Sequence, residues 1–314
     1  MSLRQVLESH ASAQILKRKT HDAARSLQIF SSPRGGSTWL MSLLSKLPGV
    51  AGVWEPLHDT KGVVPDRWGA RPHRRAMTDG DKALLAEILA GNRLNAWTCS
   101  RTPLADAMKA DQLLVKYVRG NSLLPLVLDE WDLKHKPVLL MRHPFDVVTS
   151  QVKAFGARPA DLDLESDYAE HVLLHEHWGR VKEISDPLER QLHLWCLLNA
   201  PLWQTYADSE EVVAVHYHDL VLDPEHSLKD ILRQLAWNPQ HPVQGWSPDA
   251  FVADLDLRAT SDTDFGGDFL ANQQDQLWKN IKRLTPEEKK RYQGVFDTYG
   301  LTLYSMDEVK PRRS

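Results

Sequence analysis

The sequence lacks the features that mark several large classes of protein. Only two cysteines occur in 314 residues, Cys99 and Cys196, and they lie far apart and outside any CxxC pair. So few cysteines argue against a disulfide framework and favour a reducing compartment. No apolar run approaches the roughly 18 residues of a membrane span, and residues 1–25 lack the apolar core of a signal peptide. We therefore expect a cytoplasmic protein without a membrane span.

A surplus of basic residues is also missing. The formal net charge is −4, and no long basic run occurs. Nucleic-acid-binding domains usually gather their lysines and arginines on one face, so we expect no nucleic-acid partner. The densest basic stretch, 71–75, is interpreted as a solvated loop. With 42% hydrophobic and 25% charged residues, the chain can bury an ordinary globular core.

Apolar strand candidates alternate with helical patterns along the chain. This order predicts an α/β fold with a P-loop-like central parallel sheet, flanked by helices on both faces. We expect one domain over 1–314, with a helical lead-in over 1–25. The expected strands are 27–32, 50–54, 112–118, 136–142 and 210–217. The expected helices are 36–47, 121–133 with Asn121 as N-cap, one from 144, two within 166–208, 225–235 and 286–298, and an irregular tail covers 247–277.

The loop between the first expected strand and helix carries residue types that bind an anion. Gly35 and Gly36 let the backbone turn tightly and approach a ligand. N–H groups at the start of the helix would point at the anion, and the hydroxyls of Ser37 and Thr38 add donors. Arg34 adds a permanent positive charge. A nucleotide-hydrolysing P-loop has a lysine before its Ser or Thr, and its absence here weakens a Mg-ATP interpretation.

A second strand end repeats the combination of an arginine and a hydroxyl. Arg142 ends the strand 136–142, and Ser150 follows eight residues later on the next helix. Eight residues are about two helical turns, so Ser150 stays near one helix face but lies well along it. The pair could grip a second phosphate, distant from the first. In a parallel sheet both loops would lie at the carboxyl-terminal edge, where ligands of α/β proteins bind.

Together these motifs resemble the sulfotransferases that use 3′-phosphoadenosine 5′-phosphosulfate (PAPS) and release adenosine 3′,5′-bisphosphate (PAP). In that family, the loop after the first strand holds the 5′-phosphosulfate. An arginine at a strand end and a serine eight residues on hold the 3′-phosphate, as Arg142 and Ser150 would here. Segment 212–237 resembles the family's strand, tyrosine and helix. Tyr217 falls on the tyrosine near the adenine, and His218 replaces the usual glutamate.

The resemblance implies a transferase that moves a sulfuryl group from PAPS to a hydroxyl of a small molecule or sugar. It implies no metal, and the oligomeric state stays open. Trp39 would pack on the adenine, as an aromatic after the loop does in some relatives. The cofactor-binding residues that the resemblance implies are Arg34, Gly35, Gly36, Ser37, Thr38, Trp39, Arg142, Ser150 and Tyr217.

The arginine in the loop narrows the resemblance. The cytosolic steroid and phenol enzymes carry lysine where Arg34 stands, whereas carbohydrate and bacterial trehalose sulfotransferases carry arginine. The trehalose enzyme has a Gly-Val-Ala-Gly run leading into Glu-Pro, and this sequence reads GVAGVWEP, so Glu55 inherits the role of general base. His58 competes with it, because histidine is the base in the cytosolic branch. Arg34 would stabilise charge on the leaving phosphate.

Several features stay open. Lys116 ends an apolar strand and could reach the sulfate or the acceptor, although a lysine at a strand end more often extends to solvent. Segment 59–110 matches nothing in the family and is expected to carry acceptor choice, and Trp54 could form part of an acceptor wall. The pair His171 and His175 has zinc-compatible spacing, but the proposed chemistry needs no metal. The alternatives are a P-loop nucleotide kinase or NTPase and a non-catalytic nucleotide-binding protein.

Overall fold

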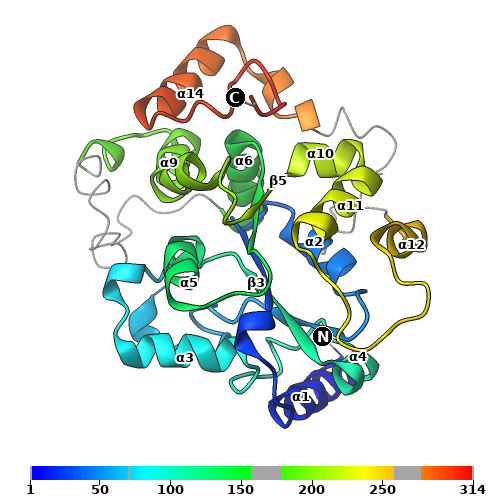
Figure 1. The fold of residues 1–314 in the computed structure, drawn as a ribbon. Coiled ribbons are helices and arrows are strands. Elements are labelled where there is room, and N and C mark those ends of the chain that lie inside the picture. Colours follow the sequence, from blue (N-terminus) through cyan, green and yellow to red (C-terminus); the bar gives the residue numbers. More distant parts are fainter. Residues whose placement is uncertain (1, 70, 157–178, 258–276, 313–314) are drawn as a thin grey trace.

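The computed structural model describes residues 2–69, 71–156, 179–257 and 277–312. Its centre is a five-stranded sheet in the order β2-β3-β1-β4-β5, and every neighbouring pair of strands is parallel. In Figure 1 helices lie on either side of this sheet, with α5 and α9 on the left and α2, α10 and α11 on the right. The predicted α/β fold with a helix-flanked parallel sheet is therefore confirmed. The strands are β1 (Leu27–Ser31), β2 (Val50–Trp54), β3 (Gln112–Tyr117), β4 (Val138–Met141) and β5 (Val213–His216).

The strands are apolar on both faces because helices cover both faces. Every residue of β1, β2, β3 and β4 is buried, as expected of strands inside a two-sided parallel sheet. Only the edge strand β5 alternates between buried and half-buried residues.

The helices and short 3₁₀ turns are α1 (Leu3–Lys17), η1 (Ala23–Arg25), α2 (Ser37–Leu44), η2 (Asp66–Trp68), η3 (Arg74–Ala76), α3 (Asp79–Leu89), α4 (Leu104–Lys109), η4 (Asn121–Leu123), α5 (Leu124–Glu130), α6 (Pro144–Phe155), α9 (Pro187–Tyr206), α10 (Tyr217–Leu222), α11 (Pro224–Gln234), α12 (Pro248–Ala253), η5 (Ile281–Arg283) and α14 (Pro286–Thr298).

Most predicted elements form where the sequence places them. The last helix has the predicted bounds, because the Thr285 side chain accepts the Glu288 N–H and the Glu288 carboxylate accepts the Thr285 N–H, a capping box. Two predictions are wrong. Asn121 is not the N-cap of α5, because η4 precedes that helix and the Asn121 amide turns to Asn199 instead. The tail is not irregular throughout, since Ser247 caps the short helix α12.

The segment 59–110 is fastened by one buried carboxylate. Asp81, in the first turn of α3, is fully buried and accepts hydrogen bonds from both terminal nitrogens of Arg67. It also accepts from Trp68 Nε1 at 2.7 Å and from Thr78 Oγ1 at 2.7 Å. The bonds from Arg67 and Trp68 hold the turn η2 against the start of α3. Within the described ranges, no helix combines the length and the apolar composition needed to cross a membrane.

Candidate active site

The site residues gather where the strand order of the sheet reverses. From β1 the chain passes through α2 to the edge strand β2, and from β4 it passes through α6 towards the opposite edge strand β5. The crevice between the carboxyl ends of β1 and β4 is therefore a topological switch point, the usual ligand site of an open α/β sheet. All five strands supply candidate residues at or just beyond their carboxyl ends: Arg34 after β1, Glu55 after β2, Lys116 and Arg119 in and after β3, Arg142 after β4 and Tyr217 after β5.

The loop after β1 has the backbone of an anion-binding turn. Gly36 has φ of 98°, and a Cβ at this position would lie 2.3 Å from Cδ2 of Tyr217. Only glycine fits there, since both the left-handed backbone and the close ring exclude a side chain. No side chain caps the start of α2, so the first N–H groups of the helix stay available to a ligand.

The two predicted anion-binding motifs contact each other directly. Arg34 donates its Nε–H to Ser150 Oγ at 2.9 Å, and Arg142 Nη1 donates to the Arg34 carbonyl at 3.1 Å. The Arg142 guanidinium also lies over the Tyr217 ring, with its carbon 4.6 Å from the ring centroid. The two motifs are thus neighbours in the fold, and the expectation of a second phosphate distant from the first stays a prediction. The sequence spacing gave no measure of how close β1 and β4 are, and these strands are neighbours.

Electrostatics in this cluster favour a bound anion. Burial lowers the pKa of Arg34, and the positive charge of Arg142 lowers it further. Burial raises the pKa of the Tyr217 hydroxyl, which therefore stays neutral. Arg142 Nε is buried and has no hydrogen-bond partner among the residues that the structure describes. Two adjacent guanidiniums with a buried unsatisfied donor suit a bound phosphate group.

Glu55 follows the edge strand β2, and positively charged side chains from the neighbouring strand β3 and its loop surround it. Its Oε1 is 3.0 Å from Lys116 Nζ, and its Oε2 is 3.3 Å from Arg119 Nη1. Lys116 is only 1% exposed, and Nζ lies 3.2 Å from the centroid of the Trp54 ring. Burial lowers the pKa of Lys116 to about 8, although the charge of Glu55 opposes this shift. The lysine thus does not extend to solvent. Its buried ammonium group forms an ion pair that fixes the Glu55 carboxylate.

Two of the candidate site residues, Arg34 and Glu55, have an unusual backbone conformation. Among the described residues, three that are not glycine have positive φ, namely Arg34 at 69°, Glu55 at 39° and Ala236 at 46°. Non-glycine residues in this region are strained and concentrate at functional sites. Two of the three are residues for which the sequence predicted catalytic roles, which supports a functional reason for their conformation.

His58 is the second candidate base and lies just beyond Glu55. Its Nδ1 is 2.8 Å from Asp59 Oδ1, and its ring meets Trp97 edge-on at 5.5 Å. Burial lowers the pKa of His58, and the charge of Arg119 lowers it further, so the imidazole is neutral at pH 7. A neutral imidazole can accept a proton, so the choice between Glu55 and His58 stays open.

The two tryptophans next to the loop and to Glu55 are mostly buried. Trp39 is 4% exposed and meets Tyr217 edge-on, with ring centroids 6.3 Å apart. Trp54 is contacted by Lys116 and by Arg101, whose guanidinium carbon is 4.3 Å from the ring centroid. Trp39 is thus placed to support Tyr217 rather than to offer a broad face. Trp54 is placed to hold the cations around Glu55.

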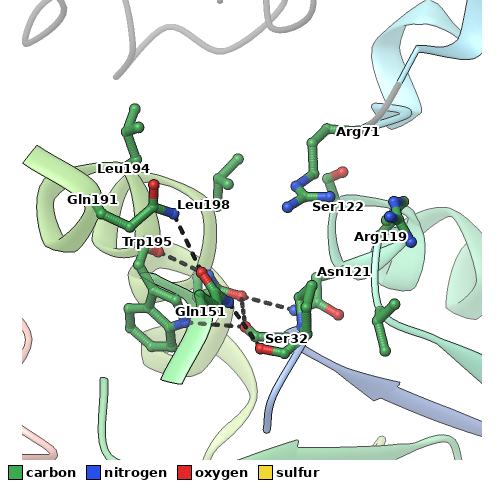
Figure 2. Close-up of a pocket in the computed structure, with 13 residues that line it drawn as sticks. Ser32, Arg71, Arg119, Asn121, Ser122, Gln151, Gln191, Leu194, Trp195 and Leu198 are labelled. Atoms are coloured by element: carbon green, nitrogen blue, oxygen red, sulfur yellow. Dashed lines mark hydrogen bonds between the residues drawn. The ribbon is translucent and has the colours of Figure 1, made fainter. Parts of the chain in front are cut away.

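A pocket opens beside the loop, between α9 and the 59–110 segment. Figure 2 shows Arg71, Ser122 and Arg119 on one side and Gln191, Leu194 and Leu198 on the other. At its base Ser32 Oγ donates to Asn199 Oδ1 at 3.0 Å, and Trp195 Nε1 donates to Ser32 Oγ at 3.1 Å. Ser32 precedes the anion-binding loop, and Arg119 bonds Glu55, so the pocket adjoins both halves of the site. Within the described chain, Trp54 does not line it.

Sequence reasoning missed three cations of the site. Arg119 follows β3 by two residues, and a cation just past an apolar strand was a usable signal at the carboxyl edge. Arg71 was interpreted as part of a solvated basic loop, but it lines the pocket. Arg101 lies over Trp54 and has no recognisable local signal, because the contact joins distant segments.

The zinc-spaced histidines lie outside the described chain, whereas both cysteines lie within it. His171, His175 and their neighbour His177 lie outside the described residues. In the ranges that are described, no three or more His, Cys, Asp or Glu side chains form a group able to hold a metal ion. Cys99 and Cys196 are buried free thiols, and burial raises the pKa of Cys99 to about 11.

Comparison with known proteins finds similar solved structures but no matching sequence family. No protein-family model matches the chain, and no curated protein does. Solved structures that resemble it include the sulfotransferase domain of the Synechococcus PCC 7002 olefin synthase, with 19% identity over 90% of this chain and 96% of that chain and a TM-score of 0.42. Mouse sulfotransferase SULT7A1, complexed with PAP, has 13% identity over 95% of this chain and 89% of that chain, with a TM-score of 0.42. The sulfotransferase from Alicyclobacillus acidocaldarius has 15% identity over 88% and 92%, with a TM-score of 0.40.

These three structures are all sulfotransferases, the class whose motifs the sequence resembles. At identities of 13–19% and TM-scores of 0.40–0.42 the likeness carries no argument about the reaction of this chain.

Proposed function

We propose that this protein is a sulfotransferase that moves a sulfuryl group from PAPS to a hydroxyl of a small molecule or sugar. The observation that carries the proposal is the contact between the two anion-binding motifs, in which Arg34 bonds Ser150 and Arg142 bonds the Arg34 carbonyl. The sulfuryl donor PAPS carries phosphate groups at two positions, so it needs two neighbouring anion-binding sites. This crevice offers two guanidiniums, a hydroxyl and an uncapped helix start.

The residues of the loop and the switch point would hold the nucleotide. The loop N–H groups and Arg34 suit the 5′ side, Arg142 and Ser150 suit the 3′-phosphate, and Tyr217 lies under Arg142. When bound, PAPS supplies the sulfuryl group and the leaving group. The further residues that would line the nucleotide are Gly35, Gly36, Ser37 and Thr38, and Trp39 would act through its edge contact with Tyr217. The fold fixes the loop N–H groups and the arginines in place. They would therefore stabilise the negative charge that develops on the leaving phosphate without having to reorganise.

Glu55 is the proposed general base, and His58 is the alternative. Both oxygens of the Glu55 carboxylate are held, one by Lys116 and one by Arg119, so its orientation is fixed at the edge of the sheet. We propose that this fixed carboxylate takes the proton of an acceptor hydroxyl bound in the neighbouring pocket. Segment 59–110 contributes Arg71 to that pocket, which supports its proposed role in acceptor choice.

Nucleotide binding is the first test. PAP should raise the melting temperature of the purified protein, because a ligand that binds only the folded state stabilises it. Arg142→Ala should remove most of this shift, whereas Arg233→Ala on the outer helix α11 should keep it. A shift with ATP and magnesium, and none with PAP, would favour a P-loop kinase or NTPase instead.

Catalysis is tested separately with labelled PAPS and a metabolite extract, followed by mass analysis for sulfated products. A protein that binds PAP but yields no sulfated product with any acceptor fraction would be a non-catalytic nucleotide-binding protein. A sulfated product that disappears in Arg142→Ala would support the transferase.

A further inference from the structure

The loop after β1 begins with a tight turn that holds an arginine in a conformation usual for glycine. The Gly35 N–H donates to the Ser32 carbonyl at 2.9 Å, which closes a four-residue β-turn. The two central residues of this turn are Pro33 and Arg34, and Arg34 has φ of 69°. Proline at the first central position and a positive φ at the second are the features of a type II turn. Glycine or asparagine is usual at the second position, so the Arg34 backbone is strained.

The same four residues have an unstrained alternative. A type I turn also accepts proline at its first central position, and its second central residue has φ of about −90°, which arginine adopts freely. The two turn types differ by rotation of the central peptide group, here the one that joins Pro33 to Arg34. Because that group is planar, its carbonyl and its N–H exchange sides when it rotates. The type II form therefore persists only if the Pro33 carbonyl is held on its present side.

Gln151 of α6 holds this carbonyl. Its Nε2 donates to the Pro33 carbonyl at 2.8 Å, and Arg142 Nη1 donates to the next carbonyl, that of Arg34, at 3.1 Å. The two peptide groups on either side of the Arg34 Cα are thus each fixed by one side chain, and together these groups set the φ and ψ of Arg34. A strained backbone persists where its surroundings over-determine it, and these two bonds do so here.

The direction of the Gln151 amide is itself determined. The Pro33 carbonyl can only accept a hydrogen bond, so the amide nitrogen of Gln151 must face it and the amide oxygen must face away. Gln191 of α9 donates its Nε2 to that oxygen at 3.2 Å, as the dashed line between the two residues in Figure 2 shows. Gln151 is 8% exposed and Gln191 is 7% exposed. A buried amide that is bonded at both ends is rigid, so α9 also helps to fix the turn.

We infer that Gln151 is a positioning residue, which keeps the central peptide group of the turn in its type II orientation and so presents Arg34 to the nucleotide. The inference rests on the proposed sulfotransferase function and adds a residue that acts through the loop rather than on the donor itself. Rotation of the peptide group between Pro33 and Arg34 would move the Arg34 side chain from the place where it now bonds Ser150. The nucleotide would then have to restore the type II turn, and its apparent affinity would fall with the fraction of molecules that retain that turn.

Gln151→Met tests the inference, because methionine keeps the length of the side chain and removes its hydrogen-bond donor. PAP affinity, measured by calorimetry, should fall about five- to tenfold, the usual effect of losing one buried hydrogen bond. Gln191→Met leaves Gln151 in place without its second bond and should weaken PAP about two- to threefold. The matched control is Gln204→Met in α9, since Gln204 also donates to backbone carbonyls, those of Tyr299 and Gly300. It should bind PAP like the wild type.

The crystal structure of the ligand-free Gln151→Met protein supplies a second readout, which a mere packing role would not move. Arg34 should have a negative φ in that structure and keep its positive φ in Gln204→Met. A positive φ of Arg34 in Gln151→Met, or unchanged PAP affinity in that variant, would overturn the inference. If Gln151→Met does not fold, PAP affinity in Gln191→Met decides, and an unchanged value overturns the inference. If the wild type fails to bind PAP, the proposed function falls, and the φ of Arg34 in free Gln151→Met still decides whether the glutamine holds the turn.

Discussion

Arg34 donates its Nε–H to Ser150 Oγ across 2.9 Å, which joins the loop after β1 to the helix after β4. The left-handed backbone of Arg34, with φ of 69°, is part of the turn that presents this side chain to α6. The bond restrains the guanidinium before any ligand arrives, so less side-chain freedom remains to be lost on binding. In the proposed function, the serine would therefore act on nucleotide affinity through the arginine as well as through its own hydroxyl.

Replacing the serine tests this coupling. Ser150→Ala should weaken PAP binding about five- to tenfold, the usual effect of losing one hydrogen bond to a charged group. Isothermal titration calorimetry gives the affinity directly. Ser209→Ala, at a half-buried position in the turn beyond α9, is the matched control and should bind like the wild type. Unchanged affinity in Ser150→Ala would show that the hydroxyl plays no part in binding.

Gly36 is the residue of the loop least able to accept a side chain. Gly36→Ala would place Cβ 2.3 Å from the Tyr217 ring at φ of 98°, so it should lower the free energy of unfolding by about 1–3 kcal/mol and abolish PAP stabilisation. Denaturant unfolding and thermal shift measure the two effects. Gly80→Ala in the first turn of α3, where the nearest atom is Thr78 Oγ1 at 3.7 Å, should stay within about 1 kcal/mol. Equal behaviour of the two variants would contradict the role of the close ring.

The elements of this fold could be predicted from local patterns because each has a local cause. The apolar runs of β1 to β4 follow from burial on both faces, and the capping box at Thr285 fixes the start of α14. Asn121 stands before an apolar run, which is the sequence signature of an N-cap, but Leu123 precedes α5 instead. The real partner of Asn121 is Asn199, 78 residues away, and no local pattern reports such a contact.

The site was predictable only in part for the same reason. Arg34, Arg142 and Ser150 belong to local strand-loop-helix motifs that can be recognised in sequence. The proximity of Arg34 to Ser150 depends on β1 lying next to β4, which is set by strand order. The two cations that bond Glu55 come from β3 and from the loop just after it. In the sequence they are separated from β2 by the whole 59–110 segment.

The two candidate bases can be separated by single substitutions. Glu55→Gln should lower kcat about 10²-fold or more, the usual contribution of a general base, and should leave PAP affinity unchanged. His58→Asn should change kcat less than about fivefold if Glu55 is the base. Steady-state sulfate transfer and PAP calorimetry provide the measurements. A large fall in His58→Asn with a small one in Glu55→Gln would assign the base to His58, and two small falls would refute the mechanism.

The buried carboxylate of Asp81 predicts an acid-sensitive segment. The Arg67 guanidinium, with help from Thr78 and Trp68, holds the pKa of Asp81 well below its ordinary value of 3.8. A depressed pKa contributes stability above pH 3.8 that is lost progressively as the pH falls below it. Asp81→Asn should therefore lower the free energy of unfolding by about 2–3 kcal/mol at pH 7, and the deficit should shrink below pH 3.8.

The matched control for this substitution is Asp79→Asn, in the same helical turn but exposed. It should change the free energy of unfolding by less than about 1 kcal/mol, since it alters only the helix dipole interaction and a weak contact with Lys82. Denaturant unfolding between pH 3 and pH 8 measures both variants. A deficit in Asp81→Asn that is independent of pH would mean that its charge does not provide the stability.

Lys116 predicts how the reaction responds to alkaline pH. Burial lowers its pKa from 10.5 to about 8, so the folded protein loses this proton near pH 8 while the unfolded chain keeps it until about pH 10.5. Between these values the unfolded state binds more protons, and the Lys116 contribution to the free energy of unfolding therefore rises with pH. The transfer activity should instead fall as the pH rises, because a neutral Lys116 no longer fixes the Glu55 carboxylate 3.0 Å away.

The sulfate-transfer rate of the wild type should thus fall as pH rises through about 8. Lys116→Met should transfer sulfate about tenfold more slowly at pH 7, the cost of one charge-assisted hydrogen bond, and should show no further fall near pH 8. The measurement is kcat against pH from 6 to 10 at saturating PAPS, with PAP affinity followed in parallel. Lys109→Met, in α4 and exposed, should keep the profile of the wild type. An alkaline fall that persists unchanged in Lys116→Met would assign it to another group and remove Lys116 from the mechanism.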